Sequence, residues 1–405
     1  MKITQAFARE KVNAGIFDGL CKENKKYWMR AKYIERSIPA FVSILSIFTV
    51  LLIYYLGVGG IEKGTVTIGL LIAFVAYVSE FWQPVISLTA LYNEIINCSV
   101  YIERIFEMLE EAGVAYKAMF TGGVDNAIAI SRKACAAGYR KFIAVGGDGT
   151  VHDVLNGIAE YVGLQSVGME EIAEYTLGVL PVGSGNDWVK STGVPRDVKE
   201  AVGVIAAGYT GLQDVVRVEV LNPSSVDASP LAVSYMANIG GVGLDARVCE
   251  IVNRKKEQGR RGKKLYVSAL LYCIRHRVPV RAKIMCDGKE VFNGRYLSIA
   301  FGVGKYSGGG MRQTPLAELG DGLLDVTVIP DIPLWIIAKE IIKLFTGNFH
   351  KVPVLTQAKC QEVLVMPDGE ADAEPVEVDG EVVGRAPVRM TVLKEQIRVV
   401  MPDQR

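Results

Sequence analysis

The segment VGGDGTV combines three glycines with one carboxylate, Asp148, and this composition suits phosphate chemistry. The glycines are Gly146, Gly147 and Gly149. Because glycine has no Cβ, backbone N–H groups in such a turn can approach an anion closely, and a following helix adds a favourable dipole. A carboxylate inside an anion-binding turn needs a metal ion or a hydroxyl group to compensate its charge. The segment therefore predicts a phosphate site with an acidic residue beside it.

A second glycine-containing loop follows in the segment LPVGSGNDW. Gly183 and Gly185 give it the same open backbone, and the hydroxyl of Ser184 can donate to a phosphate oxygen. Asn186 and Asp187 have a second interpretation, since both residue types are common N-caps and could simply begin the next helix.

Each loop lies between a strand pattern and a helix pattern. Lys141–Val145 and Thr176–Leu180 are short apolar runs typical of buried strands. After the first loop, apolar residues recur with the period of a helix at Val151, Val154, Leu155 and Ile158. Two such units place both loops at the carboxyl edge of one parallel sheet, where ligands bind in α/β folds. From about Asp214 onward strand-like alternation replaces this rhythm, so the sequence predicts an α/β part followed by a β-rich part.

The first hundred residues have a different character. Ser37–Ile61 contains no charged residue and is long enough to cross the hydrocarbon core of a membrane. A second apolar segment, Gly64–Asn93, is interrupted by Glu80 and Pro84. The alternative for each segment is a buried core helix. We expect transmembrane helices over about residues 37–61 and 66–92.

The charges that flank these segments predict an orientation. Six basic residues lie between Lys22 and Arg36, before the first span, and the link EKGT between the spans is very short. Basic residues prefer the cytoplasmic side, so both ends of the pair are expected in the cytoplasm. The sequence thus predicts a two-helix hairpin in the cell (inner) membrane, a multi-pass chain, and a cytoplasmic remainder.

Overall charge and cysteine content exclude several classes of protein. The formal net charge of the 405-residue chain is +1, which gives no global field that would favour nucleic acid. The seven cysteines are scattered and include no C-x-x-C pair. A disulfide framework and a zinc site are therefore not expected, and a reducing compartment suits the chain.

The first part of the chain resembles the end of the transmembrane domain of an ABC exporter. The resemblance rests on GTVTIGLLIAFVAYVSEFWQPVISLTALYN and on the following ERIFEMLEE, and it covers about residues 1–110. The chain contains no G-x-x-x-x-G-K-[ST] loop and no L-S-G-G-Q, so the ATPase of such an exporter is missing. Transport by this chain alone is not expected, although a transporter partner or a homodimer is possible.

From about Glu111 to the end, the chain resembles the diacylglycerol kinase catalytic domain family, in particular the bacterial lipid kinases of the diacylglycerol and sphingosine kinase superfamily. GGDGT and PVGSGND carry the resemblance, together with NIGGVGLDARV, FGVGKYSGGGMRQTPLAELGDGLLDVTV and VEVDGEVVGRAPVRMTVL. The resemblance implies two lobes with the active site between them. An α/β ATP-binding lobe would cover residues 111–213, and a β-rich lobe that binds the lipid and completes the catalytic site would cover residues 214–405.

The resemblance also implies roles for individual residues. ATP would contact Thr121, Gly146, Gly147, Asp148, Gly149, Thr150, Val151, His152 and Ser184. Asp379 would be the general base that takes the proton of the lipid hydroxyl, while Glu381 and Asp148 would belong to a Mg²⁺ and water network at the phosphates. A second, structural Mg²⁺ would be held by Asp321 with the backbone carbonyls of Glu318 and Leu323. The motif DGE occurs twice, and only the copy at Asp379–Glu381 is followed by the strand that the family has there.

Three features depart from the family. Its opening strand and N-P-x-S-G loop have no counterpart in residues 1–120, so either the end of the second membrane helix replaces the first kinase helix or the chain is a recombined gene. His152 and Asp153 replace the usual Asn-Glu, and His152 could contact a phosphate or ribose or simply lie on a helix face. The run Arg254–Lys264 has seven basic residues in eleven, which suits either a solvated loop or contact with anionic headgroups.

The sequence therefore predicts an ATP- and Mg²⁺-dependent lipid kinase held at the membrane, with diacylglycerol as the expected lipid and phosphatidic acid as the product. Two alternatives remain open at this point. NAD kinase shares a GGDGT turn, and a catalytically dead membrane protein could bind lipid or a transporter partner without transferring phosphate.

Overall fold

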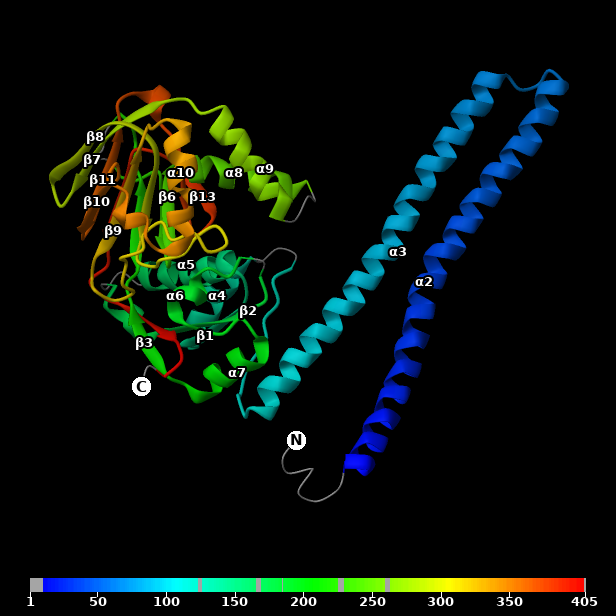
Figure 1. Cartoon of the computed structure of the whole chain (residues 1–405), viewed down its shortest axis with the longest axis horizontal. Coiled ribbons are helices and arrows are strands. Elements are labelled where there is room, and N and C mark those ends of the chain that lie inside the picture. The colour runs from blue at the N-terminus through cyan, green and yellow to red at the C-terminus, as the bar shows by residue number, and fades with distance from the viewer. Residues whose placement is uncertain are drawn as a thin grey trace. The chain divides into compact units, whose positions relative to one another are not determined.

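A computed structural model describes residues 10–122, 126–164, 169–183, 185–224, 229–258 and 263–403. The chain separates into two compact units, Met1–Glu107 and Met108–Arg405. The first unit contains little more than two long helices, α2 (Glu10–Glu62) and most of α3 (Ile68–Glu111), which Figure 1 shows in blue and cyan.

The two long helices form a hairpin. Within them, Pro39–Glu62 and Ile68–Val85 are long and apolar enough to cross a membrane, and only about 6% of their residues are buried. A Cβ at Gly57 of α2 would collide with Leu71 of α3, so glycine allows the helices to approach closely beside the turn. Helices therefore cover both expected spans, although the second apolar segment ends before residue 92.

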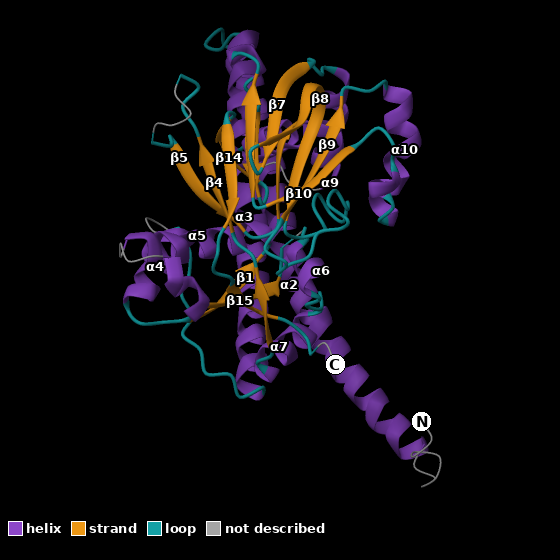
Figure 2. Ribbon diagram, turned by 90° about the vertical axis from the view of Figure 1, so that its left-hand side faces the viewer, coloured by secondary structure: helices purple, strands orange, loops and turns teal. Residues whose placement is uncertain are grey.

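The second unit contains two sheets, which Figure 2 shows as separate groups of strands. The small sheet has the order β1-β2-β15-β3, with β1 and β15 parallel to β2 and β3 antiparallel to β15. Its strands are β1 (Lys141–Gly146), β2 (Thr176–Pro181), β3 (Thr210–Gln213) and β15 (Ile397–Val400). Its helices are α4 (Ala127–Ala136), α5 (Asp148–Leu164), η1 (Met169–Glu174), α6 (Trp188–Thr192) and α7 (Val198–Ala207). Among the described residues, β1 is the first strand of the chain and lies at the edge of this sheet.

The large sheet has eleven strands and follows the order β13-β12-β6-β8-β7-β11-β14-β4-β5, with β9 pairing with β8 and β10. Its strands are β4 (Val216–Val220), β5 (Ala232–Met236), β6 (Ile239–Gly243), β7 (Val280–Cys286), β8 (Lys289–Gly302), β9 (Leu324–Pro330), β10 (Thr356–Cys360), β11 (Glu362–Pro367), β12 (Pro375–Val378), β13 (Glu381–Arg385) and β14 (Val388–Val392). The helical segments after β5 are α8 (Leu244–Glu257), α9 (Lys263–Arg275), α10 (Leu334–Thr346), η2 (Phe349–Lys351) and η3 (Glu370–Asp372). This arrangement agrees with the predicted β-rich C-terminal region.

One element departs from the predicted division at residue 214. β15 is close to the C-terminus, yet it lies in the small sheet between β2 and β3 rather than in the β-rich region. Its apolar residues Ile397 and Val399 are buried in that sheet. Helix α5 connects the two sheets, because it packs against β1 of the small sheet and against β5 of the large one. Residues at the N-terminal end of α5 are thereby placed beside segments of the large sheet.

Candidate active site

The two glycine-containing loops meet at the carboxyl edge of the small sheet. β1 and β2 are parallel, and their last residues, Gly146 and Pro181, are register partners. A Cβ at Gly183 would collide with the backbone of Gly147, so the two loops touch backbone to backbone. A larger residue at Gly183 would push the loops apart, whereas a Cβ at Gly147 would lie 3.3 Å from Cα of Gly183. The predicted placement of both loops at one edge is what the sheet shows.

Asp148 joins these loops through its carboxylate. The backbone N–H of Asp187 donates to both oxygens of Asp148, at 2.8 and 3.0 Å, and the N–H of Trp188 donates to Oδ1 at 2.9 Å. Asp148 therefore caps the N-terminus of α6 from a different loop. Burial raises the pKa of Asp148 and the two N–H groups lower it, while the charges of Asp187 and Asp379 raise it further, with a net rise.

Asn186 and Asp187 do not cap α6 with their side chains. Asn186 adopts a positive φ of 53°, and its Nδ2 donates to the carbonyls of Pro181 and Gly183 at 3.0 and 2.7 Å, which fixes the second loop. Asp187 makes no side-chain cap bond; instead its carboxylate accepts the ammonium of Lys190 at 2.5 Å and the N–H of Gly309 at 2.6 Å. Asp187 thus connects the loop to the glycine-rich segment 308–310.

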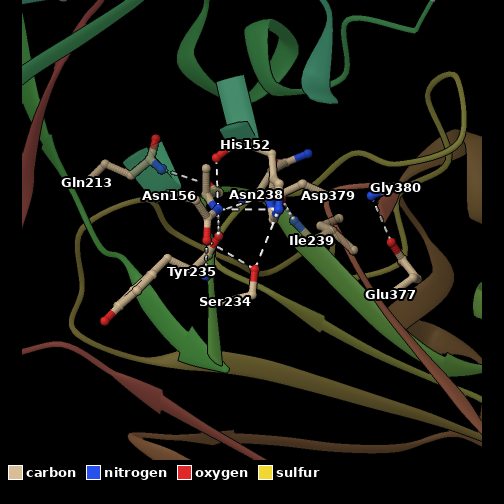
Figure 3. Close-up of polar contacts among 11 residues, drawn as sticks. His152, Asn156, Gln213, Ser234, Tyr235, Asn238, Ile239, Glu377, Asp379 and Gly380 are labelled. Atoms are coloured by element: carbon tan, nitrogen blue, oxygen red, sulfur yellow. Dashed lines mark hydrogen bonds and ion pairs between the residues drawn. The ribbon is translucent and has the colours of Figure 1, made fainter. Parts of the chain in front are cut away.

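Asp379 lies in the tight turn between β12 and β13, with a φ of 52°. Figure 3 shows its carboxylate surrounded by polar contacts. The backbone N–H of Ala237 donates to Oδ2 at 2.8 Å, and those of Asn238 and Ile239 donate to Oδ1 at 2.9 and 3.2 Å. Its side chain is only 3% exposed. The turn therefore holds Asp379 rigidly against the link between β5 and β6.

His152 is the fourth partner of that carboxylate. Its Nδ1 lies 3.2 Å from Oδ2 of Asp379, and its Nε2 lies 3.3 Å from Nδ2 of Asn156 and 3.5 Å from Oγ of Ser234. Burial lowers the pKa of His152, but the hydrogen bond and charge of Asp379 outweigh this effect and raise it. The ring is buried and directed at Asp379, a contact that neither expectation for His152 included. Its contact with a phosphate or ribose stays a prediction.

Glu381, the first residue of β13, also lies beside the glycine turn. A Cβ at Gly149 would lie 3.4 Å from Oε1 of Glu381, so β13 and the start of α5 are in close contact. Nδ2 of Asn253 lies 3.4 Å from Oε2 of Glu381 and donates to the carbonyl of Gly380 at 3.0 Å. Burial raises the pKa of Glu381. The fold therefore brings Asp148, Asp379 and Glu381 to the glycine turn from distant parts of the sequence.

The turn before β9, where a structural Mg²⁺ was expected, is arranged differently. Nζ of Lys359 lies 2.9 Å from Oδ2 of Asp321 and 3.2 Å from Oδ2 of Asp325. Lys359 and Asp325 are register partners of the antiparallel pair β10 and β9, so the ammonium is held between the two carboxylates. No group of three or more His, Cys, Asp or Glu side chains that could hold a metal occurs among the described residues. Because a cation already lies there, the residues do not fit a metal held by Asp321 with Glu318 and Leu323.

The remaining residues that were expected to contact ATP lie in different environments. Val151 is 2% exposed, so its side chain belongs to the core, and its N–H donates to the carbonyl of Gly147. Thr150 makes the same kind of helix-starting bond, at 3.0 Å. Thr121 is exposed in the irregular segment before α4, and its role stays a prediction. Ser184 lies outside the described residues.

Sequence reasoning missed the polar residues that hold this site together. Asn156 Nδ2 donates to the carbonyl of Tyr235 at 2.9 Å, and Asn156 Oδ1 accepts the N–H of Tyr235 at 2.9 Å. Asn238 donates through Nδ2 to the carbonyl of Tyr306 at 2.8 Å. The sequence signal for Asn156 was its position one helical turn after His152, on an otherwise apolar helix face. That pattern does not predict which residues Asn156 contacts.

Comparison with known proteins gives a consistent result. Residues 97–218 match the model of the diacylglycerol kinase catalytic domain, and residues 238–401 match that of the YegS C-terminal NAD kinase beta sandwich-like domain. A diacylglycerol kinase from Staphylococcus carnosus is 25% identical over 307 residues, which cover 74% of this chain and 89% of that protein. A solved structure described as a diacylglycerol kinase from Bacillus anthracis has a TM-score of 0.54 at 20% identity and covers 75% of this chain and 92% of its own. An uncharacterized ABC transporter ATP-binding protein, YknV of Bacillus subtilis, is 36% identical over 112 residues, 27% of this chain and 18% of that protein.

The first family match begins at residue 97, inside α3, so it includes the end of the second long helix. The two matches together contain the glycine turn, the loop after β2 and the turn that carries Asp379. The chain therefore contains the catalytic domain of the diacylglycerol kinase family, followed by a YegS-type C-terminal domain.

Proposed function

We propose that the chain is an ATP- and Mg²⁺-dependent lipid kinase that transfers the γ-phosphoryl group of ATP to a lipid hydroxyl, with diacylglycerol as the acceptor. The observation that carries this proposal is the convergence of Asp148, Asp379 and Glu381 on the glycine turn Gly146–Thr150. Phosphoryl transfer needs phosphate positioning, neutralisation of charge and a base near the acceptor hydroxyl. The names of the relatives support the choice of diacylglycerol.

The nucleotide would lie with its phosphates on the edge of the small sheet. Gly147 and Gly183 contact each other there without side chains, which leaves the backbone of both loops open to an anion. The N-terminus of α5 begins at Asp148 in the same place and adds a positive dipole end. These features support binding of the triphosphate rather than of the adenine.

Mg²⁺ would be held by Asp148 and Glu381 together with the nucleotide phosphates. Magnesium in kinases is commonly bound by one or two carboxylates plus phosphate oxygens rather than by a complete protein cage. The carboxylates here are buried acids with raised pKa values, which is the arrangement that a cation stabilises. When bound, the ion would neutralise the charge that develops on the transferred group.

Asp379 would accept the proton. The lipid hydroxyl oxygen attacks the γ-phosphorus, the bond from the γ-phosphorus to the bridging oxygen of ADP breaks, and the hydroxyl proton moves to the carboxylate. Both oxygens of Asp379 accept backbone N–H groups, and in the described part of the chain His152 is the one side chain within hydrogen-bond distance of them.

The α2–α3 hairpin would anchor the enzyme in the membrane that contains its substrate. Few residues of its apolar segments are buried, whereas a core helix of a soluble protein would be mostly buried. We place the hairpin across the inner membrane and the remainder of the chain in the cytoplasm. The relative with exporter-like sequence extends far beyond the matched region, so transport is not part of this proposal.

The experiment that tests the function is transfer of γ-labelled phosphate from Mg-ATP to a panel of acceptors by membranes that contain the full chain. The panel would include diacylglycerol, a sphingoid base, a polyprenol and NAD. We expect a labelled lipid that is lost in Asp379→Asn. Label on NAD alone would identify the chain as an NAD kinase. A folded protein that labels no acceptor would favour a lipid-binding protein without activity.

A further inference from the structure

Helix α10 presents three large apolar side chains to the outside. Trp335, Ile342 and Phe345 are 68%, 68% and 55% exposed, and their spacing of seven and three residues places them on one helix face. On the other face lies Glu340, whose side chain is only 14% exposed and pairs with Lys343 at 2.6 Å. A surface helix in water normally turns its apolar stripe inward. The outward face of α10 therefore requires an apolar environment.

The surrounding chain holds α10 in this orientation at both ends. Before the helix, Arg277 donates to the carbonyl of Ile332 at 2.8 Å. At its end, the N–H of Arg312 donates to the carbonyl of Leu344 at 2.7 Å, and α10 packs against η2. The helix cannot simply rotate to bury Trp335 and Phe345 without breaking these contacts.

The chemistry of the exposed face fits a lipid surface. Tryptophan is common at the membrane–water interface, where its ring is apolar and its N–H is hydrated. Lys339 is also exposed, between the apolar residues of the same face, and its long stem allows the ammonium to reach a phosphate while the neighbouring side chains enter the acyl region. An apolar face with lysine beside it is typical of helices that lie in the interface of an anionic membrane.

A chain of contacts leads from α10 to the candidate active site. The Arg312 guanidinium lies 5.0 Å from the centroid of the Tyr306 ring, and the Lys190 ammonium lies 5.9 Å from the same ring. Lys190 pairs with Asp187, whose N–H donates to Asp148. Docking of α10 on a surface would thus also affect Asp187, the residue whose N–H holds the carboxylate of Asp148.

We propose that α10 is a membrane-docking helix that inserts Trp335, Ile342 and Phe345 into the interface of an anionic lipid bilayer and presents the active site to lipid substrates there. This inference rests on the proposed function for the identity of the substrate, but the docking itself does not require catalysis. It adds a second lipid contact to the one that the α2–α3 hairpin would make.

A spin label on α10 tests the docking without any need for activity. The full chain with Cys21→Ser and Cys98→Ser retains only buried cysteines, so a nitroxide can be attached selectively at Ile342→Cys. In vesicles of phosphatidylcholine and phosphatidylglycerol, we expect oxygen to relax this label more than a nickel chelate does. A matched label at Lys289→Cys, in the exposed start of β8, should remain accessible to nickel. Equal nickel access at both positions would overturn the proposal. Protection of the label at residue 342 from both oxygen and nickel, together with spin–spin broadening, would show that a second copy of the chain covers α10 instead.

An activity measurement then separates docking from catalysis. Ile342→Asp with Phe345→Asp should lower phosphorylation of long-chain diacylglycerol in the bilayer by at least about tenfold, since two apolar side chains would lose their burial. Turnover of a short-chain, water-soluble diacylglycerol should stay within about twofold, because the altered residues do not line the carboxylate cluster. Equal loss on both substrates would contradict the inference. A wild-type chain that phosphorylates no lipid would overturn the proposed function, while the spin-label result would still decide the docking.

Discussion

Nδ1 of His152 lies 3.2 Å from Oδ2 of Asp379, so the first turns of α5 contact the turn that carries the proposed base. The two residues are far apart in the sequence and belong to elements associated with different sheets. The contact is buried, which makes the hydrogen bond between a histidine and a carboxylate stronger than it would be in water. His152 therefore restricts where the carboxylate of Asp379 can lie.

Removal of this side chain should impair turnover more than substrate binding. A hydrogen bond to a charged group contributes about 1.5–3 kcal/mol, so we expect His152→Ala to lower kcat by about 10- to 100-fold with little change in KM for ATP. His152→Asn, whose amide can also donate to Asp379, should recover part of the loss. Steady-state kinetics of both variants on the labelled lipid provide the measurement. An equal rise in KM for ATP would instead place His152 at the nucleotide.

Asp148 is expected to have two separable roles, in capping α6 and in binding Mg-ATP. Asp148→Asn keeps an oxygen that can accept the N–H of Trp188, whereas Asp148→Ala removes it. Loss of a cap costs about 1 kcal/mol, so only the alanine variant should lower the melting temperature appreciably. Both variants should lose stabilisation by Mg-ATP, which thermal shift measures with and without the nucleotide. Retention of that stabilisation in Asp148→Asn would argue against the carboxylate as a magnesium ligand.

Some of these relationships could be predicted from the sequence and others could not. The strand, glycine turn and helix around Asp148 follow from local periodicity, and so does the edge at which Gly147 and Gly183 meet. The cap that Asp148 provides to α6 depends on contact between residues 39 positions apart, which no local pattern encodes. The return of β15 to the small sheet is equally non-local, because its alternation fits either sheet. Tertiary contacts decide such cases.

The same reason applies to the turn before β9. The sequence shows Asp321 there, and the resemblance implied a metal held by Asp321 with the backbone carbonyls of Glu318 and Leu323. The register of β10 against β9 then places Lys359 opposite Asp325, and that register is set by the sheet as a whole. A pattern of carboxylates cannot reveal that a lysine from another strand supplies the positive charge.

The close contact of the two loops makes a glycine substitution informative. In Gly183→Ala the new Cβ would collide with the backbone of Gly147, which cannot yield as a flexible side chain could. We expect the loops to separate and the KM for ATP to rise by about tenfold or more. Gly203→Ala in α7 is the matched control, because no atom lies within 4 Å of its new Cβ and alanine favours a helix. If both variants bind ATP like the wild type, the loops do not form the phosphate site.

Lys359 should act as the permanent cation of the turn before β9. Burial lowers the pKa of Lys359, but the hydrogen bonds to Asp321 and Asp325 outweigh this and raise it, so the ammonium stays charged near neutral pH. We expect the melting temperature of the wild type without nucleotide to be insensitive to EDTA. Lys359→Met should lower the melting temperature, since it leaves Asp321 and Asp325 without a counterion, and Mg²⁺ or Ca²⁺ should partly restore it. If EDTA lowers the melting temperature of the wild type but not that of an Asp321→Asn variant, the turn binds a metal after all.

A buried carboxyl away from the site gives a prediction for pH. Asp245 accepts the hydroxyl of Ser298 at 2.7 Å and Nε2 of Gln313 at 2.9 Å, and its burial raises its pKa in spite of both bonds. The folded chain therefore binds this proton more tightly than the unfolded chain does. The stabilisation is complete below the unfolded pKa of about 4 and is lost as pH rises through the folded pKa.

Asp245→Asn removes this titration while it keeps an oxygen that accepts the two bonds. Above about pH 4 the melting temperature of the wild type should fall more steeply with rising pH than that of the variant, because each unit of raised pKa costs about 1.4 kcal/mol once the group ionises. Glu290→Gln, an exposed acid on β8 that pairs with Lys283 at 3.0 Å, serves as the control and should keep the wild-type slope. Parallel curves for wild type and Asp245→Asn would mean that the folded chain solvates this carboxylate, and the core beneath α8 would then have to admit water.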